Sequence, residues 1–160
     1  MHVDRLAEQL LCAGLIGSDA KFPTPAPSAL VESIATLARL HGVEPLLHRC
    51  AVKAKSLLLW PQALLEQFAQ TTRAQAVTEV LWQREIRQLL DALDSAGVPA
   101  LLLKGAPLAY THYEAPYLRP RGDTDVLIPV DQRAAAHGVL LDCGYTAAIS
   151  PASSFASYQL

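Results

Sequence analysis

Residues 98–109 read VPALLLKGAPLA and residues 118–128 read LRPRGDTDVLI, and these two stretches decide the fold of the last third of the chain. Each contains a short apolar run bounded by glycine, proline or charged residues. Such runs predict buried strands, here over residues 98–103 and 123–128. Pro107 is expected to begin a helix between the two strands.

The residues on either side of these stretches follow a helical period. A further helix is expected over residues 131–142, ended by Gly144, so the order strand, helix, strand, helix has an α/β style. Before residue 98, apolar residues recur every three or four positions. Thr71 and Thr72 weaken helix preference and leave room for a kink or break in the longest helix. The predicted helices before residue 98 cover residues 4–15, 28–40, 45–52 and 61–95.

The longest predicted helix carries a stripe of large side chains that indicates a packed scaffold. Trp60 and Trp82, together with Phe68, are predicted to be core aromatics rather than a platform on which ligands stack. The expected apolar stripe of this helix consists of Leu65, Phe68, Val80, Ile86, Leu90 and Leu93.

The composition is typical of a globular protein in a reducing compartment. The chain has 160 residues, 51% of them hydrophobic and 18% charged, with a formal net charge of -2. This balance argues against a surface of excess Lys and Arg that would bind nucleic acid. Cys12, Cys50 and Cys143 form no C-x-x-C pair and are expected to be buried thiols. No run approaches the roughly 18 apolar residues of a membrane span, so the expected location is the cytoplasm.

Asp123 and Asp125 are the first candidates for a functional site. Alternate residues of a strand face the same side, about 6.6 Å apart along its axis, so both carboxylates are expected on one face. Two such carboxylates can share hard divalent cations and leave coordination positions for phosphates, as Mg²⁺ prefers. The structural alternative is a solvated turn or helix cap. The apolar residues 126–128, directly after the pair, fit that alternative poorly, because nearby carboxylates beside a buried strand repel each other without a cation.

The turn formed by Lys104, Gly105 and Ala106 is the second candidate for chemistry. Glycine lets a phosphate approach the backbone, and the start of the following helix presents free N–H groups to an anion. Lys104 adds a positive point charge at the same turn. Arg119 and Arg121 flank the two aspartates and could neutralise either these carboxylates or a bound triphosphate. The turn and both arginines are therefore predicted to bind nucleotide phosphates.

Together, the two quoted stretches resemble the uncharacterised nucleotidyltransferase family, within the DNA polymerase β-like nucleotidyltransferase superfamily. The family has an LKG strand and turn, here residues 103–105, before an R-P-x-x-D-x-D strand, here residues 119–125. A helix that ends in Gly-Tyr follows, which matches residues 144–145. The stretch HGVEPLL at residues 41–47 is also similar to the family. The resemblance covers about residues 28–147.

The resemblance implies an α+β fold. A helical region, residues 1–97, would precede a partial nucleotidyltransferase-like mixed sheet with flanking helices, residues 98–160. Asp123 and Asp125 match the family's metal-binding aspartates, which implies that they are catalytic and hold Mg²⁺ or Mn²⁺, and Gly105 matches the glycine of the phosphate turn. The implied reaction transfers a nucleoside monophosphate from an NTP, expected to be ATP, to an unknown acceptor with release of pyrophosphate.

Two departures from the superfamily pattern bear on activity. Ala106 stands where the superfamily usually has serine, so a hydroxyl that bonds a phosphate is missing. The superfamily also places a third carboxylate on a later strand, and neither Asp131 nor Asp142, the only acids after Asp125, fits that position. We therefore expect a chain truncated at its C-terminus, such as a gene fragment or a product without its C-terminal half, with an incomplete catalytic site.

Two other functions stay open at the level of sequence. One is a non-catalytic module that binds nucleotide or protein, in which an unpaired strand edge would favour a homo-oligomer or a partner. Metal-dependent NTP binding without pyrophosphate release would favour this module. The other is a helical scaffold rich in Ala and Leu, without a ligand. Neither a membrane nor nucleic acid is expected as a partner of this chain.

Overall fold

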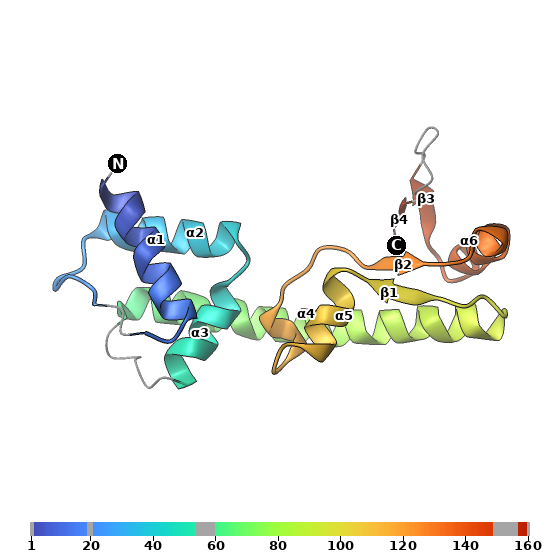
Figure 1. The fold of residues 1–160 in the computed structure, drawn as a ribbon, viewed down its shortest axis with the longest axis horizontal. Helices are drawn as coiled ribbons and strands as arrows, with labels where there is room; N and C mark the ends of the chain where they lie inside the picture. Colours follow the sequence, from blue (N-terminus) through green and yellow to red (C-terminus); the bar gives the residue numbers. More distant parts are fainter. Residues whose placement is uncertain (1, 19–20, 54–59, 149–156, 160) are drawn as a thin grey trace. The chain divides into compact units, whose positions relative to one another are not determined.

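The computed structural model describes residues 2–18, 21–53, 60–148 and 157–159 (Figure 1). Its contacts divide the chain into two compact units, Met1–Glu79 with Leu108–Gly122 and Val80–Pro107 with Asp123–Leu160. We call these the N-terminal unit and the C-terminal unit. Each unit combines two separate stretches of the chain, and the predicted domain of residues 98–160 stays a prediction.

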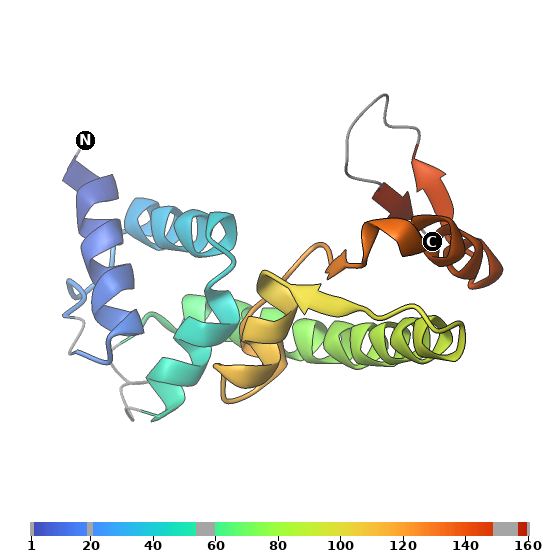
Figure 2. The same cartoon turned by 45° about the vertical axis from the view of Figure 1, so that its right-hand side comes forward.

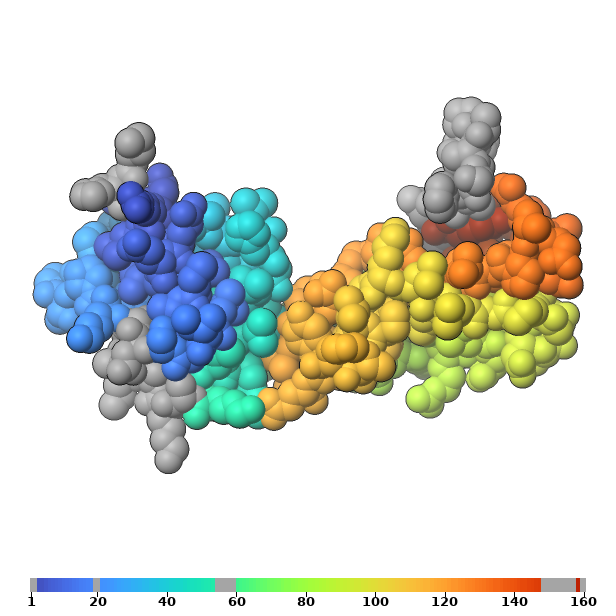
Figure 3. Space-filling model, in the orientation of Figure 1, coloured from blue at the N-terminus to red at the C-terminus, as the bar shows by residue number. Residues whose placement is uncertain are grey.

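The first three helices of the N-terminal unit pack with the beginning of the fourth around one core (Figure 1), and Figure 3 shows the first two helices side by side at the surface of this unit. The predicted helices are confirmed, with α4 continuing into the C-terminal unit. This helix passes through Thr71 and Thr72 without a break. The Thr72 hydroxyl donates a hydrogen bond to the Phe68 carbonyl oxygen at 2.6 Å, which satisfies the hydroxyl within the helix. The four helices are α1 (His2–Leu15), α2 (Ser28–Leu40), α3 (Glu44–Lys53) and α4 (Gln62–Ser95).

The core of the N-terminal unit contains two of the predicted core aromatics. Trp60 and Phe68 are 6% and 0% exposed, and their ring centroids lie 6.2 Å apart in an edge-to-face arrangement. The Phe22 ring lies 5.0 Å from that of Trp60. Trp82, the third predicted aromatic, is half-buried. Aliphatic side chains complete this core, among them Leu10, Leu11, Leu30, Ile34, Leu47, Leu64 and Leu65.

The buried face of α4 differs in part from the predicted apolar stripe. Val80 is 65% exposed, whereas its neighbour Glu79 is only 3% exposed. Apart from Leu64 in its first turn, the buried residues of α4 fall on a repeat of alternating steps of three and four, which keeps side chains on one helix face. Glu79 lies on that face and Val80 does not, so the prediction for Val80 was wrong. The buried residues on this repeat are Leu65, Phe68, Glu79, Ile86, Leu89 and Leu93.

Two antiparallel strand pairs and short helices form the C-terminal unit (Figure 2). The α+β class is confirmed, and the parallel pairing of a mixed sheet does not occur among the described residues. Leu89 and Leu93 of α4 form the core of this unit with Val98 and Ala136. The strands are β1 (Leu101–Leu103) with β2 (Asp125–Leu127), and β3 (Thr146–Ala148) with β4 (Ser157–Gln159). The C-terminal unit also contains the end of α4, a 3-10 helix (Val130–Gln132) and α6 (Arg133–Asp142). The helix α5 (Gly105–Thr111) begins in this unit and belongs to the N-terminal unit from Leu108 on.

The first strand pair is shorter and more exposed than the sequence predicts. β1 and β2 have three residues each, and α5 begins at Gly105 rather than at Pro107. Leu101 and Leu127 lie opposite each other in the register and are 60% and 53% exposed. Opposite residues of a strand pair share one face, so this face of the pair is open to solvent. The expectation of a fully buried first strand was therefore wrong.

The cysteines also lie closer to the surface than expected. Cys12 and Cys143 are exposed and Cys50 is half-buried, all three as free thiols. Cys12 lies on the outer face of α1, while Cys143 lies in the turn after α6, so neither position faces a core. Separately, none of the helices in the described part of the chain is both long and apolar enough to cross a membrane.

Gly14 allows a close approach between α1 and Trp60. A Cβ atom at Gly14 would lie 2.5 Å from Trp60 Cζ2 and 2.8 Å from Cη2, which no relaxed contact permits. We expect Gly14→Ala to lower the free energy of unfolding by about 1–3 kcal/mol because the core becomes overpacked. Urea denaturation followed by circular dichroism would measure this change.

Gly138→Ala in α6 is the matched control, because nothing lies within 4 Å of a Cβ atom at that position. It should stabilise the protein by roughly 0.5–1 kcal/mol through helix propensity alone. Equal effects of the two substitutions would show that Gly14 is not a packing constraint.

Candidate functional site

The register of β1 against β2 brings Lys104 to Asp125. Leu103 pairs with Asp125, so Lys104 follows directly after the pairing ends. At Lys104 the backbone turns into α5 with φ of 55°, the left-handed region that few residues other than glycine adopt. The Lys104 ammonium donates to Asp125 Oδ1 at 2.9 Å. Two candidates that are far apart in the sequence therefore share one ion pair.

Asp123 lies outside the strand on which the sequence predicts it. β2 begins at Asp125, because β1 turns away at Lys104 and offers no backbone partner to residues 123–124. The rule that alternate strand residues share a face therefore does not apply to Asp123, and that prediction was wrong. Asp123 is exposed, but its charge still reaches the same site, since it contributes to the raised pKa of Lys104.

The charges of the site favour a cation beside Asp125. The pKa of Lys104 is raised, first by its hydrogen bond to Asp125 and then by the charges of Asp125 and Asp123. Thr124 Oγ1, between the two aspartates in sequence, is buried and has no hydrogen-bond partner among the described residues. A buried hydroxyl of this kind is often satisfied by water or an ion. Both observations fit a ligand that brings positive charge and polar atoms.

A divalent cation fits this donor set only in part. Carboxylate oxygens are hard ligands that suit Mg²⁺ or Mn²⁺. The described residues contain no group of three or more His, Cys, Asp or Glu side chains that could hold a metal ion. Asp123 and Asp125 would supply part of an octahedral shell, and waters or phosphate oxygens would have to supply the rest.

Gly105 and Ala106, predicted to form the turn before the helix, are the first two residues of α5. Ala106 is 1% exposed and belongs to the interior, so its methyl group is not available to a ligand. Because α5 has only seven residues, we assign no anion site to its N-terminus. The positive charge for a phosphate at this turn comes from Lys104, and the contacts of Gly105 and Ala106 stay predictions.

The two arginines of the motif contact aromatic side chains. The Arg119 guanidinium lies 5.7 Å from the ring centroid of Tyr113 and donates to its hydroxyl at 3.3 Å. Arg121 lies 5.1 Å from the ring centroid of Tyr110 and donates to that hydroxyl at 2.8 Å. These contacts give both arginines a place in the N-terminal unit, and their binding to phosphates stays a prediction.

Arg121 also forms a buried ion pair with Glu79 of α4. Its two terminal nitrogens donate to the Glu79 oxygens at 2.8 and 3.0 Å, and both side chains are 5% exposed. The Tyr110 hydroxyl donates to Glu79 at 2.9 Å, and burial followed by this hydrogen bond raises the pKa of Tyr110. Glu79 was not among the residues that the sequence predicted to be functional or buried. Its position on the repeat of Phe68 and Ile86 was the signal that could have revealed a buried acid.

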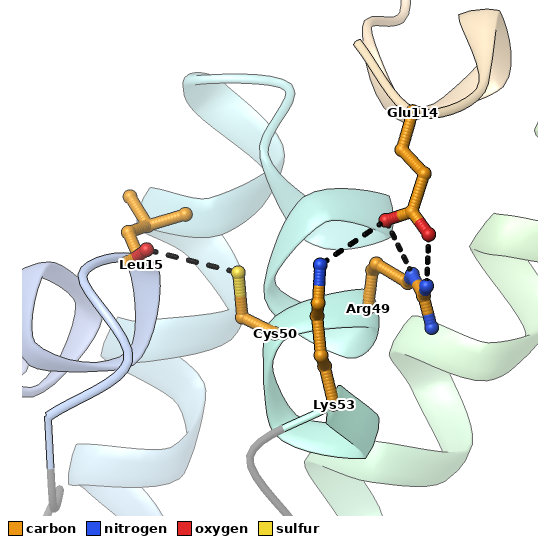
Figure 4. A network of polar contacts seen from close by, with 5 residues as sticks. All are labelled: Leu15, Arg49, Cys50, Lys53 and Glu114. Atoms are coloured by element: carbon orange, nitrogen blue, oxygen red, sulfur yellow. Dashed lines mark hydrogen bonds and ion pairs between the residues drawn. The ribbon is translucent and has the colours of Figure 1, made fainter.

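An exposed ion pair in the same unit provides a comparison (Figure 4). Arg49 of α3 binds Glu114 through two nitrogens, and Lys53 Nζ lies 3.7 Å from the same carboxylate. The hydrogen bond from Arg49 is the main cause of the lowered pKa of Glu114. Beside them, the Cys50 thiol donates to the Leu15 carbonyl oxygen at 3.7 Å. The described residues of this unit thus include both a buried and an exposed arginine–carboxylate pair.

Removal of the arginine should affect these two pairs very differently. Arg121→Met leaves Glu79 buried without its main counterion, and we expect a loss of about 3–5 kcal/mol in the free energy of unfolding. Arg49→Met should cost far less, because water solvates Glu114. Urea denaturation of both variants measures the difference. Adding Glu79→Gln to Arg121→Met should recover part of the loss, and equal losses for the two arginines would contradict the burial argument.

The sequence of the chain was compared with protein families, curated proteins and solved structures. The model of an uncharacterised nucleotidyltransferase family matches residues 27–159, which include Lys104, Asp123 and Asp125. No curated protein and no solved structure matches the chain. The family match covers well over half of the 160 residues. The chain therefore belongs to the uncharacterised nucleotidyltransferase family.

Proposed function

We propose that the protein transfers a nucleoside monophosphate from an NTP to an acceptor in a reaction that depends on Mg²⁺ or Mn²⁺. Asp123 and Asp125 would hold the metal ion, and Lys104 would contact the phosphates. The observation that carries this proposal is the contact of Lys104 with Asp125 at 2.9 Å, within the residues that match the family. It places an anion-binding and a cation-binding group side by side, as a metal–triphosphate complex requires.

The proposed reaction assigns simple roles to the residues of the site. An acceptor oxygen or nitrogen would attack the α-phosphorus of the NTP and give up its proton, while the bond to the β-phosphate breaks and pyrophosphate leaves. A bound Mg²⁺ would supply charge stabilisation to the phosphate oxygens. Asp123 and Asp125 would position that charge, and Lys104 would offset negative charge on the phosphates. ATP is our first choice of nucleotide.

A second candidate function is nucleotide binding without catalysis. It is supported by the limited donor set, since only Asp123 and Asp125 gather at the site and no third acid joins them among the described residues. A protein of this kind would bind MgATP and release no pyrophosphate. The two functions therefore share the binding step and differ in turnover.

Thermal unfolding with and without MgATP tests the binding step. A ligand at 100 times its Kd that binds only the folded state should stabilise the protein by about 2.7 kcal/mol. We expect this shift in the wild type, and its loss when EDTA is present or when Asp123→Asn and Asp125→Asn are combined. Asp142→Asn is the matched control, because Asp142 is an exposed acid of α6.

The proposed site would be rejected if millimolar MgATP did not stabilise the wild type against thermal unfolding. It would also be rejected if MgATP stabilised the double variant as much as the wild type. Pyrophosphate release from labelled ATP in the presence of protein extracts then separates the two functions. Binding with release indicates a transferase. Binding without release under any acceptor condition favours the non-catalytic module.

A further inference from the structure

The Lys104 ammonium lies against Asp125, one of the two proposed metal ligands. We infer that Lys104 is an internal counterion that a metal–nucleotide complex displaces, so that the site prefers this complex over the free metal ion. This inference rests on the proposed function and adds a binding order to it. In the ligand-free protein, the Lys104 ammonium neutralises Asp125; with the complex bound, it would move to the phosphates.

The contact with Asp125 is direct and charge-assisted. Lys104 Nζ lies 2.9 Å from Asp125 Oδ1, the distance of a strong hydrogen bond between charged groups. A divalent ion bound through the same carboxylate would meet a positive charge at this distance. Free metal ions must therefore break the ion pair or bind next to the ammonium, and both weaken their affinity.

The same ion pair is easy to open. The Lys104 side chain is 73% exposed and that of Asp125 is 31% exposed. Exposed ion pairs contribute little stability, because water solvates both groups when they separate. Lys104 can therefore leave Asp125 without unfolding the strand pair, provided that another anion receives its charge. The triphosphate of a metal–nucleotide complex is such an anion.

The backbone holds the base of the Lys104 side chain in place. Position 104 lies between the last paired residue of β1 and the first residue of α5, with φ of 55°. A side chain other than glycine, asparagine or aspartate is uncommon in this conformation, and its strain often accompanies function. The fixed backbone and the exposed ammonium together allow Lys104 to exchange partners at one site.

Charge balance explains why metal and nucleotide should bind together. Asp123 and Asp125 carry two negative charges, of which Lys104 offsets one. Free Mn²⁺ or Mg²⁺ releases Lys104 without offering it a partner, whereas the complex with a triphosphate supplies one. Nucleotide should therefore raise the affinity for metal, and this coupling depends on the lysine charge.

Titration of Mn²⁺, followed by the electron paramagnetic resonance of the free ion, tests this coupling. Lys104→Met should bind Mn²⁺ alone about fivefold or more tightly than the wild type. We expect α,β-methylene-ATP, which resists transfer, to raise the Mn²⁺ affinity of the wild type. In Lys104→Met, the same nucleotide analogue should raise the Mn²⁺ affinity much less. Lys104→Arg keeps the charge and should retain the wild-type behaviour.

Lys104→Gly provides a second neutral variant that suits the positive φ, in case the methionine variant does not fold. Unchanged Mn²⁺ affinity in the neutral variants would overturn the inference. The proposed function would still hold if the wild type bound the Mn²⁺–nucleotide complex through Asp123 and Asp125. If the wild type binds no such complex, the proposed function fails, and the inference fails with it.

Discussion

One helix, α4, contributes to both hydrophobic cores in the described part of the chain, and its buried face repeats at alternating steps of three and four residues. Leu65 and Phe68 belong to the core of the N-terminal unit, and Leu89 and Leu93 to that of the C-terminal unit. A helix of 34 residues is about 50 Å long, so one element can serve two separate packing centres. Because so much apolar surface depends on this face, a polar residue on it must be compensated.

Glu79 is that polar residue, and Arg121 compensates it. Desolvating two charges is expensive, and an apolar pair of similar size often gives equal or better stability. The pair nevertheless holds Arg121 against Glu79 of α4. Arg121 lies two residues before Asp123 in the sequence. Phe68 and Ile86, on the same repeat, show that apolar side chains suit this face. The buried ion pair thus attaches the Arg121 stretch to α4 within the N-terminal unit.

The candidate site follows a different principle, because its charges are exposed and exchangeable. Lys104 and Asp125 meet at the end of a strand pair, where water reaches both side chains. The family shows the general class of chemistry. In the proposed function, a metal ion held by Asp123 and Asp125 would keep coordination positions for a substrate. Exposed charged side chains that water solvates on separation can exchange partners, as the binding of a charged ligand requires.

The sequence by itself determined the helices, the α+β class and the family, because these depend on local periodicity and on short motifs. It also singled out Lys104, Asp123 and Asp125 as candidates. Only the tertiary structure decided that Asp123 lies outside β2, since strand length depends on where the partner strand ends. In the same way, burial of Glu79 depends on Arg121, which lies far away in the sequence. Contacts between such distant residues leave no local pattern, so the chain must fold before they can be identified.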